Sequence, residues 1–232
     1  MRGSLPVTFL FLGISLVTST SARVLDVHSE IRVAKSGELT VTERITVEAH
    51  EKTGALQREL PPGSLVVEVI RNGHPERYAL DDGMRLRAGG EALPAGRHLY
   101  QITYRCPRRI AFLPDHDALH WNLKGAGRVT AEVILPSSVP AREIKVEASG
   151  GSCQGGGICQ TFIRNGRAAF RGQGDIGIVV RFPKGVVAEP AIDERARWFF
   201  SDYFGAVLVL ALIALTAGFL IQARKLSRTQ GY

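Results

Sequence analysis

Histidine and aspartate side chains gather in one eight-residue segment, and their types suit it to chemistry. Two imidazoles lie four positions apart with a carboxylate between them, which is the spacing of the zinc-binding motif of metalloproteases. That motif works on a helix, where both imidazoles share one face and a glutamate reaches the metal-bound water. The segment reads Asp115-His116-Asp117-Ala118-Leu119-His120-Trp121-Asn122.

The surroundings of this segment argue against a zinc site. Pro114 precedes it, strand-like sequence surrounds it, and Asp117 is one methylene shorter than the required glutamate. A calcium or magnesium site at Asp115 and Asp117 is a second interpretation, but it needs several more oxygen ligands. We favour a structural interpretation, in which the aspartates hold a turn through local backbone hydrogen bonds. Leu119 and Trp121 would then alternate into the core.

Other catalytic arrangements find little support. The sequence has neither a Gly-x-Ser-x-Gly elbow nor a phosphate-binding glycine loop. The carboxylates of Glu43, Glu59, Asp115 and Asp117 could form a glycosidase pair only if two of them faced each other across a cleft, and solvated or turn-forming carboxylates are the simpler interpretation. We therefore predict no catalytic residue, no cofactor and no metal ligand. The candidate binding residues are Asp115, His116, Asp117, His120, Trp121 and Asn122.

Apolar residues in the region 23–188 recur with a period of two, which predicts strands. Leu39, Val41, Ile45 and Val47 fall on one face of such a strand, and a turn at 35–37 joins it to residues 24–33 as a hairpin. Further strands are expected at 65–70, 98–105, 129–135, 144–148, 168–171 and 176–182, and the first of these leads into Asn72-Gly73, a strong turn signal. We predict an all-β fold, an antiparallel immunoglobulin-like β-sandwich, with a closed barrel as the alternative.

Two apolar runs frame this domain. The first, at 5–17, follows Arg2 and leads to small residues ending at Ala22, which predicts a cleavable signal peptide over 1–22. The alternative is an uncut signal anchor, although the run is short for a membrane span. The second run, at 204–221, follows aromatic residues and precedes Arg224, Lys225 and Arg228.

The second run predicts a single transmembrane helix over 199–222, with a buried core helix as the alternative. A stalk at 189–198 would lead into this helix, and a short basic tail at 223–232 would follow it in the cytoplasm. The exported domain, 23–188, would then lie outside the cell membrane. Ala214 and Gly218 form a small-xxx-small pair, which is compatible with a homodimer through this helix.

The charge balance indicates the kind of partner. The formal net charge is +7 and the sequence pI is about 9.7, so the chain should be attracted to anionic surfaces. An exported domain rarely meets nucleic acid. We therefore expect the membrane itself and an envelope protein or cell-wall polymer as partners, and no nucleic acid.

Cysteine usage agrees with an oxidising compartment. Cys153 and Cys159 flank a short glycine-rich loop, and we expect them to form a disulfide that contributes roughly 2 kcal/mol. A metal-binding pair is the rival interpretation, but it lacks a nearby third ligand. Cys106 is left over, and we interpret it as a buried thiol, with an intermolecular disulfide as the alternative.

Five segments resemble one known family. They are LTVTERI at 39–45, GRHLYQITYR at 96–105, FLPDHD at 112–117, HWNLKG at 120–125 and FPKGVV at 182–187. They are similar to a family of uncharacterised predicted bacterial membrane proteins, a domain of unknown function with YciQ-like members. The cysteine pair also falls where that family often has one. His120 departs from the pattern, since family members usually have tyrosine there, which weakens the two-histidine metal interpretation further.

The resemblance implies an exported N-terminal domain followed by membrane helices, and it carries no established activity. Typical members continue into further helices, whereas this sequence ends at Tyr232. Two functions from different classes follow. We favour a membrane-anchored extracytoplasmic module that binds a protein or an envelope polymer. The alternative is a metal-dependent or hydrolytic ectodomain centred on Asp115–His120.

Overall fold

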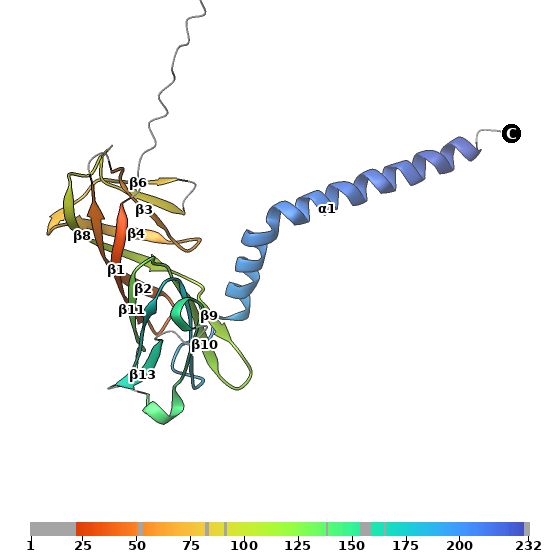
Figure 1. The fold of residues 1–232 in the computed structure, drawn as a ribbon. Coiled ribbons are helices and arrows are strands. Elements are labelled where there is room, and N and C mark those ends of the chain that lie inside the picture. Colours follow the sequence, from red (N-terminus) through yellow and green to blue (C-terminus); the bar gives the residue numbers. More distant parts are fainter. Residues whose placement is uncertain are drawn as a thin grey trace, which may run out of the picture. The chain divides into compact units, whose positions relative to one another are not determined.

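The computed structural model describes residues 22–50, 53–81, 84–90, 92–137, 139–153, 159–164 and 166–229. The chain divides into two compact units, Met1–Val187 and Ala188–Tyr232. The first unit is built almost wholly of strands, and the second contains one helix (Figure 1). The predicted signal peptide lies outside the described residues except for Ala22.

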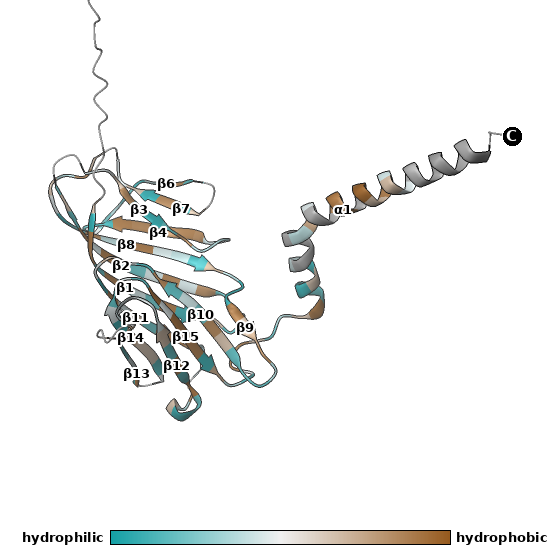
Figure 2. Ribbon diagram, turned by 45° about the vertical axis from the view of Figure 1, so that its right-hand side comes forward, coloured by the Kyte–Doolittle hydropathy of each residue, from teal (hydrophilic) through white to brown (hydrophobic). Residues whose placement is uncertain are grey.

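The largest sheet has eight strands in the order β13-β14-β11-β1-β2-β8-β4-β5 (Figure 2). β1 pairs with β11 in parallel, and the other neighbouring pairs are antiparallel. The strands are β1 (Arg23–Val33), β2 (Leu39–Ala49), β4 (Leu65–Arg71), β5 (His74–Pro75), β8 (Gly96–Cys106), β11 (Arg128–Ile134), β13 (Gln160–Arg164) and β14 (Arg167–Gln173).

Two smaller sheets complete the first unit. A four-stranded sheet has the order β12-β15-β10-β9, and a three-stranded sheet has the order β3-β7-β6. Their strands are β9 (Ile110–Phe112), β10 (Asp117–Leu123), β12 (Lys145–Ser149), β15 (Ile176–Phe182), β3 (Leu56–Glu59), β6 (Tyr78–Asp81) and β7 (Arg85–Ala88). Two short 3₁₀ helices, η1 (Ala141–Glu143) and η2 (Gly151–Cys153), lie in the connections on either side of β12.

One hydrophobic core joins the three sheets. Ile31 of β1, Leu86 of β7 and Ile178 of β15 belong to the same buried cluster. The alternation in β2 explains the core on the large sheet, because every second residue from Leu39 to Ala49 is buried. The predicted all-β class is therefore confirmed, whereas the immunoglobulin-like topology is not confirmed.

Two predicted turns are present. β1 and β2 form the expected hairpin, with Gly37 at φ 82° in the connection, a conformation that favours glycine. β4 and β5 are joined through Asn72 and Gly73, whose φ angles of 51° and 85° are those of a two-residue hairpin turn with both central residues left-handed. These local signals therefore fixed the register of both hairpins.

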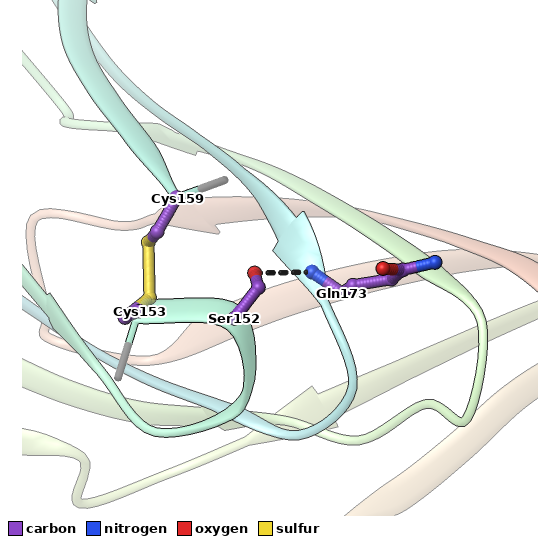
Figure 3. Close-up of a disulfide and its surroundings, with 4 residues drawn as sticks. All are labelled: Ser152, Cys153, Cys159 and Gln173. Atoms are coloured by element: carbon purple, nitrogen blue, oxygen red, sulfur yellow. Dashed lines mark hydrogen bonds between the residues drawn. A yellow bond between two sulfur atoms is a disulfide. The ribbon is translucent and has the colours of Figure 1, made fainter. Parts of the chain in front are cut away.

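The predicted disulfide between Cys153 and Cys159 is present (Figure 3). It joins the end of η2 to the residue before β13, and the intervening 154–158 lie outside the described residues. Beside it, the backbone N–H of Gln173 donates to Ser152 Oγ at 2.8 Å, which ties η2 to the end of β14. Cys106 is a buried free thiol, as predicted.

The second unit consists mainly of α1 (Ile192–Thr229). The helix includes Asp193, Glu194 and Arg195, which we had expected in a stalk, and it continues into the expected tail. By length and composition, no single helix among the described residues could cross a membrane. The segments Ile192–Trp198 and Tyr203–Gly218, bent by 66°, meet these criteria only as a pair.

Candidate functional site

The structure divides the predicted binding cluster between different surroundings. Residues 117–123 form strand β10, and successive side chains of a strand point to opposite faces. Asp115 and His116 line a cavity of about 470 Å³, Asp117 is buried, and His120, Trp121 and Asn122 line a second cavity of about 340 Å³.

Asp115 and His116 form the turn that enters β10. Asp115 Oδ1 lies 2.8 Å from His116 Nδ1, and the backbone N–H of Leu113 donates to the carbonyl oxygen of His116 at 3.0 Å. A backbone hydrogen bond at Asp115 and the contact with His116 lower the pKa of the Asp115 carboxyl. These contacts are those of a turn with an exposed carboxylate.

Asp117 is engaged elsewhere, by the segment after β15. Its Oδ1 accepts a hydrogen bond from Lys184 Nζ at 2.8 Å, and the side chain is only 1% exposed. The same ammonium group lies 5.5 Å from the centre of the Phe112 ring. Among the described residues, no group of three or more His, Cys, Asp or Glu side chains could hold a metal ion. The zinc arrangement also needs a helix, and β10 is a strand.

The cavity of about 340 Å³ combines the exposed residues of β10 with buried charge, and we call it the Arg58 pocket. Its lining includes Glu43 of β2, Arg58 of β3 and Tyr104 of β8, together with His120, Trp121 and Asn122 of β10. Strands of all three sheets therefore contribute to one recess.

A buried hydrogen-bonded ion pair forms part of the pocket wall. Arg58 Nε donates to Glu43 Oε2 at 2.6 Å, and Arg58 Nη2 donates to Glu43 Oε1 at 2.9 Å. Tyr104 Oη donates to the same Oε1 at 3.1 Å. Arg58 Nη1 donates to the carbonyl oxygen of Lys124 at 2.8 Å. The carboxylate of Glu43 thus accepts three hydrogen bonds, and the pair is bidentate.

Electrostatics favour the charged form of Arg58 and the neutral form of Tyr104. Burial alone would lower the pKa of Arg58, but the Glu43 carboxylate outweighs burial and raises it. Burial raises the pKa of Tyr104 well above its usual value, the Glu43 charge raises it further, and Arg58 opposes the rise in part. Arg58 therefore stays charged and Tyr104 stays neutral throughout the physiological pH range.

Hydrogen bonds and an ion pair also hold the cationic side chains at the rim of the Arg58 pocket in place. Arg109 Nη2 donates to the carbonyl oxygen of Pro62 at 2.6 Å, and Arg109 Nε donates to Cys106 Sγ at 3.1 Å. Lys124 Nζ lies 3.4 Å from Asp175 Oδ2. The cationic groups of the rim are thus positioned before any ligand arrives, which reduces the entropy lost on binding.

The arrangement of the carboxylates in the Arg58 pocket suits ligand binding better than catalysis. Glu43 and Glu59 line the same pocket, but both carboxylate oxygens of Glu43 already accept hydrogen bonds from Arg58 and Tyr104. Asp115 and Asp117, the other carboxylates considered for a glycosidase pair, do not line this pocket. A general acid or base needs free access to the reacting atom.

Sequence reasoning considered Glu43 only as a glycosidase carboxylate, and it missed Arg58 and the ion pair between them. Glu43 lies between Val41 and Ile45 in the alternation of β2, so the period of two already placed its carboxylate on the core face. A carboxylate at such a position needs a cationic partner. Arg58 could not be identified as that partner, because β3 has only four residues and pairs with the distant β7.

Two tyrosines of β8 provide a matched test of this network. Tyr104→Phe should lower the free energy of unfolding by about 1–2 kcal/mol, because it removes a donor to a buried carboxylate. Tyr100→Phe should be neutral or slightly stabilising near pH 7, because the buried Tyr100 hydroxyl has no hydrogen-bond partner among the described residues. Denaturant unfolding of the full chain measures both, and equal losses would contradict the assignment.

The raised pKa of Tyr100 also predicts that the stability of the protein falls at alkaline pH. Burial raises the pKa of Tyr100 to about 12, with Arg71 opposing and Glu76 supporting the rise. In the unfolded chain the phenol ionises near pH 10. The stability tied to neutral Tyr100 is therefore complete below about pH 10 and is lost as the pH rises towards 12. Tyr100→Phe should flatten this decline, and Tyr78→Phe, at an exposed position, should leave it unchanged.

Comparison with known proteins gives a family but no activity. The model of the family described as "Predicted membrane protein (DUF2207) N-terminal domain" matches residues 23–169. No curated protein matches the sequence. The earlier resemblance to a family of uncharacterised membrane proteins is thereby confirmed.

Several solved structures show a partial likeness to this chain. Yeast LTA4 hydrolase matches with 13% identity and a TM-score of 0.48, over 70% of this chain and 29% of that one. An M1 zinc metallopeptidase from Deinococcus radiodurans has 15% identity and a TM-score of 0.41, over 69% and 42%. Legionella pneumophila aminopeptidase A has 10% identity and a TM-score of 0.44, over 71% and 22%. The chain spans less than half of each, and such likeness supports no functional inference.

Proposed function

Because the chain belongs to the DUF2207 family of predicted membrane proteins, we propose that it is a membrane-anchored extracytoplasmic module that binds an envelope protein or polymer and catalyses no reaction. The Arg58 pocket carries this proposal. It is an open recess whose charged groups are fixed by one another, with exposed His120 and Asn122 beside it. A preformed polar recess favours recognition.

The proposed topology rests on the sequence and on the family. The apolar run at 204–221 is followed by Arg224, Lys225 and Arg228, which are retained on the cytoplasmic side. We infer that residues 199–222, which include the segment Tyr203–Gly218 of the bent pair described above, cross the cell membrane once, although no single described helix meets the criteria for a span. We also infer that the signal peptide 1–22 directs the β domain outwards. The family description, a predicted membrane protein, supports the anchoring.

A photo-crosslinking residue placed at position 120 or 122 of the full chain, in its own membrane, tests the pocket. We expect both positions to give the same adduct, because both side chains are exposed on β10 beside the recess. A discrete adduct sensitive to protease would identify a protein partner, and a ladder sensitive to glycosidases would identify a polymer.

The matched control is position 142 on η1, whose side chain is 83% exposed and lies outside the pocket. It should give neither adduct. The proposal fails if position 142 gives the same products as positions 120 and 122, or if neither pocket position gives any adduct.

A further inference from the structure

The outer face of the eight-stranded sheet carries a second recess, which shares no lining residue with the Arg58 pocket. Val129, Ala131 and Val133 of β11 are buried in the core, so Thr130 and Glu132 project from the opposite face. A cavity of about 680 Å³ lies over β1, β11, β14 and β13, which are neighbours in the sheet (Figure 2). We call it the arginine groove, and its lining includes His28, Thr130, Phe162, Arg164, Arg167 and Arg171.

Positive charge predominates in the arginine groove. Its lining has three arginines and one carboxylate, that of Glu132, which lies 3.3 Å from Arg167 Nη1. Among the described residues, Arg164 and Arg171 have no acidic partner within ion-pair distance. Two guanidinium groups can therefore accept an anionic ligand without breaking an ion pair, and their planar forks match carboxylate and phosphate groups.

The groove also holds an exposed aromatic ring. Phe162 on the edge strand β13 is 42% exposed, and its partner in the register is the small Ala169. Phe162 lies between Arg164 and Gln160 along β13, and Gln160 is the register partner of Arg171. The ring face of Phe162 can cover the apolar face of a sugar and remove it from water.

The register extends this pattern across the sheet in rows that run perpendicular to the strands. Two basic rows lie four residues apart along each strand, which is about 13 Å, and a row with carboxylates lies between them. One basic row contains Arg164, Arg167 and Arg32, the other contains Arg171, His28 and Arg44, and Glu132 and Glu30 lie between.

We propose that the arginine groove binds a linear anionic polysaccharide of the cell envelope, which lies along β13 and β14 so that its acidic groups reach Arg164 and Arg171 and a sugar ring covers Phe162 between them. The alternation of basic and acidic rows favours a narrow chain, because a flat anionic bilayer would meet Glu132 and Glu30 together with the arginines. The hollow of the groove also admits a chain where a planar surface cannot enter.

Sodium polygalacturonate, a linear chain of carboxylated sugars, is the probe, titrated into the full chain in neutral detergent micelles at several salt concentrations. Arg164→Gln with Arg171→Gln should weaken binding about fivefold or more and make it less salt-dependent, because two exposed charge contacts are lost. The matched control is Arg85→Gln with Arg87→Gln on β7, which removes the same charge from another sheet and should change the affinity less than twofold.

Phe162→Ala tests the contribution of apolar contact to binding separately from that of the arginine charges. It should weaken polygalacturonate binding about threefold with an unchanged salt dependence, because the ring contributes apolar contact only. The proposal is overturned if the β7 control weakens binding as much as the groove variant, or if polygalacturonate does not bind. It is also overturned if only phosphatidylglycerol vesicles bind and the groove arginines govern that binding. None of these outcomes bears on adducts from positions 120 and 122.

Discussion

Arg58→Met is expected to lower the free energy of unfolding by about 3–5 kcal/mol, the largest loss that we predict for an ion pair in this protein. The side chains of Arg58 and Glu43 are 10% and 4% exposed, and they share two hydrogen bonds. Removal of the guanidinium leaves a buried carboxylate with Tyr104 as its only remaining hydrogen-bond donor among the residues described. Denaturant unfolding of the full chain in neutral detergent, followed by intrinsic fluorescence, measures the change.

Two further variants test whether an uncompensated buried charge causes this loss of stability. Glu43→Met combined with Arg58→Met should recover part of the loss, because an apolar pair of similar volume carries no unpaired charge. Arg167→Met breaks the more exposed pair with Glu132 and should cost at most about 1 kcal/mol. If the double variant is no more stable than Arg58→Met, an uncompensated charge is not the cause of the loss.

Trp121→Ala should lower the free energy of unfolding by about 3–5 kcal/mol through the cavity that it leaves. Trp121 is 5% exposed in the core, between Leu119 and Leu123 on the buried face of β10, and it also lines the Arg58 pocket. The same variant should therefore abolish the adduct from position 120, because the wall that supports this position collapses. Denaturant unfolding and the crosslinking assay measure the two effects.

Trp121→Phe is the matched control. The indole Nε1 is buried without a hydrogen-bond partner among the described residues, so its loss should cost little beyond the smaller ring, about 1–2 kcal/mol. A loss as large as that of Trp121→Ala would mean that the indole N–H has a partner, such as a bound water, that matters more than the packing.

Local patterns predicted the parts of this fold that depend on neighbouring residues. The turn at 35–37 and the Asn72-Gly73 pair specify hairpins through backbone angles, and both hairpins are present. The alternation of Leu119 and Trp121 predicted their burial, and it is observed. The three-stranded sheet was missed because strands of four residues, such as β6 with all its side chains exposed, are too short to show a period.

The candidate site was less predictable because its members come from distant segments. The Asp115–Asn122 cluster looked like one site in sequence, but Asp115 and His116 line one cavity, Asp117 is buried against Lys184, and only residues 120–122 line the Arg58 pocket. The pairing of Glu43 with Arg58 depends on the packing of β2 against a separate sheet. Such a contact leaves no periodic trace in either strand.

The parallel pairing of β1 with β11 affects how the chain reaches its native state. The first strand lies in the middle of the large sheet, and its Asp26 is aligned with Arg128, about a hundred positions later. Until residue 134 is available, one side of β1 is an open edge that can pair with another chain. Contacts this distant in sequence also slow folding. The folding chain therefore depends on protection of this edge from self-association until β11 pairs with it.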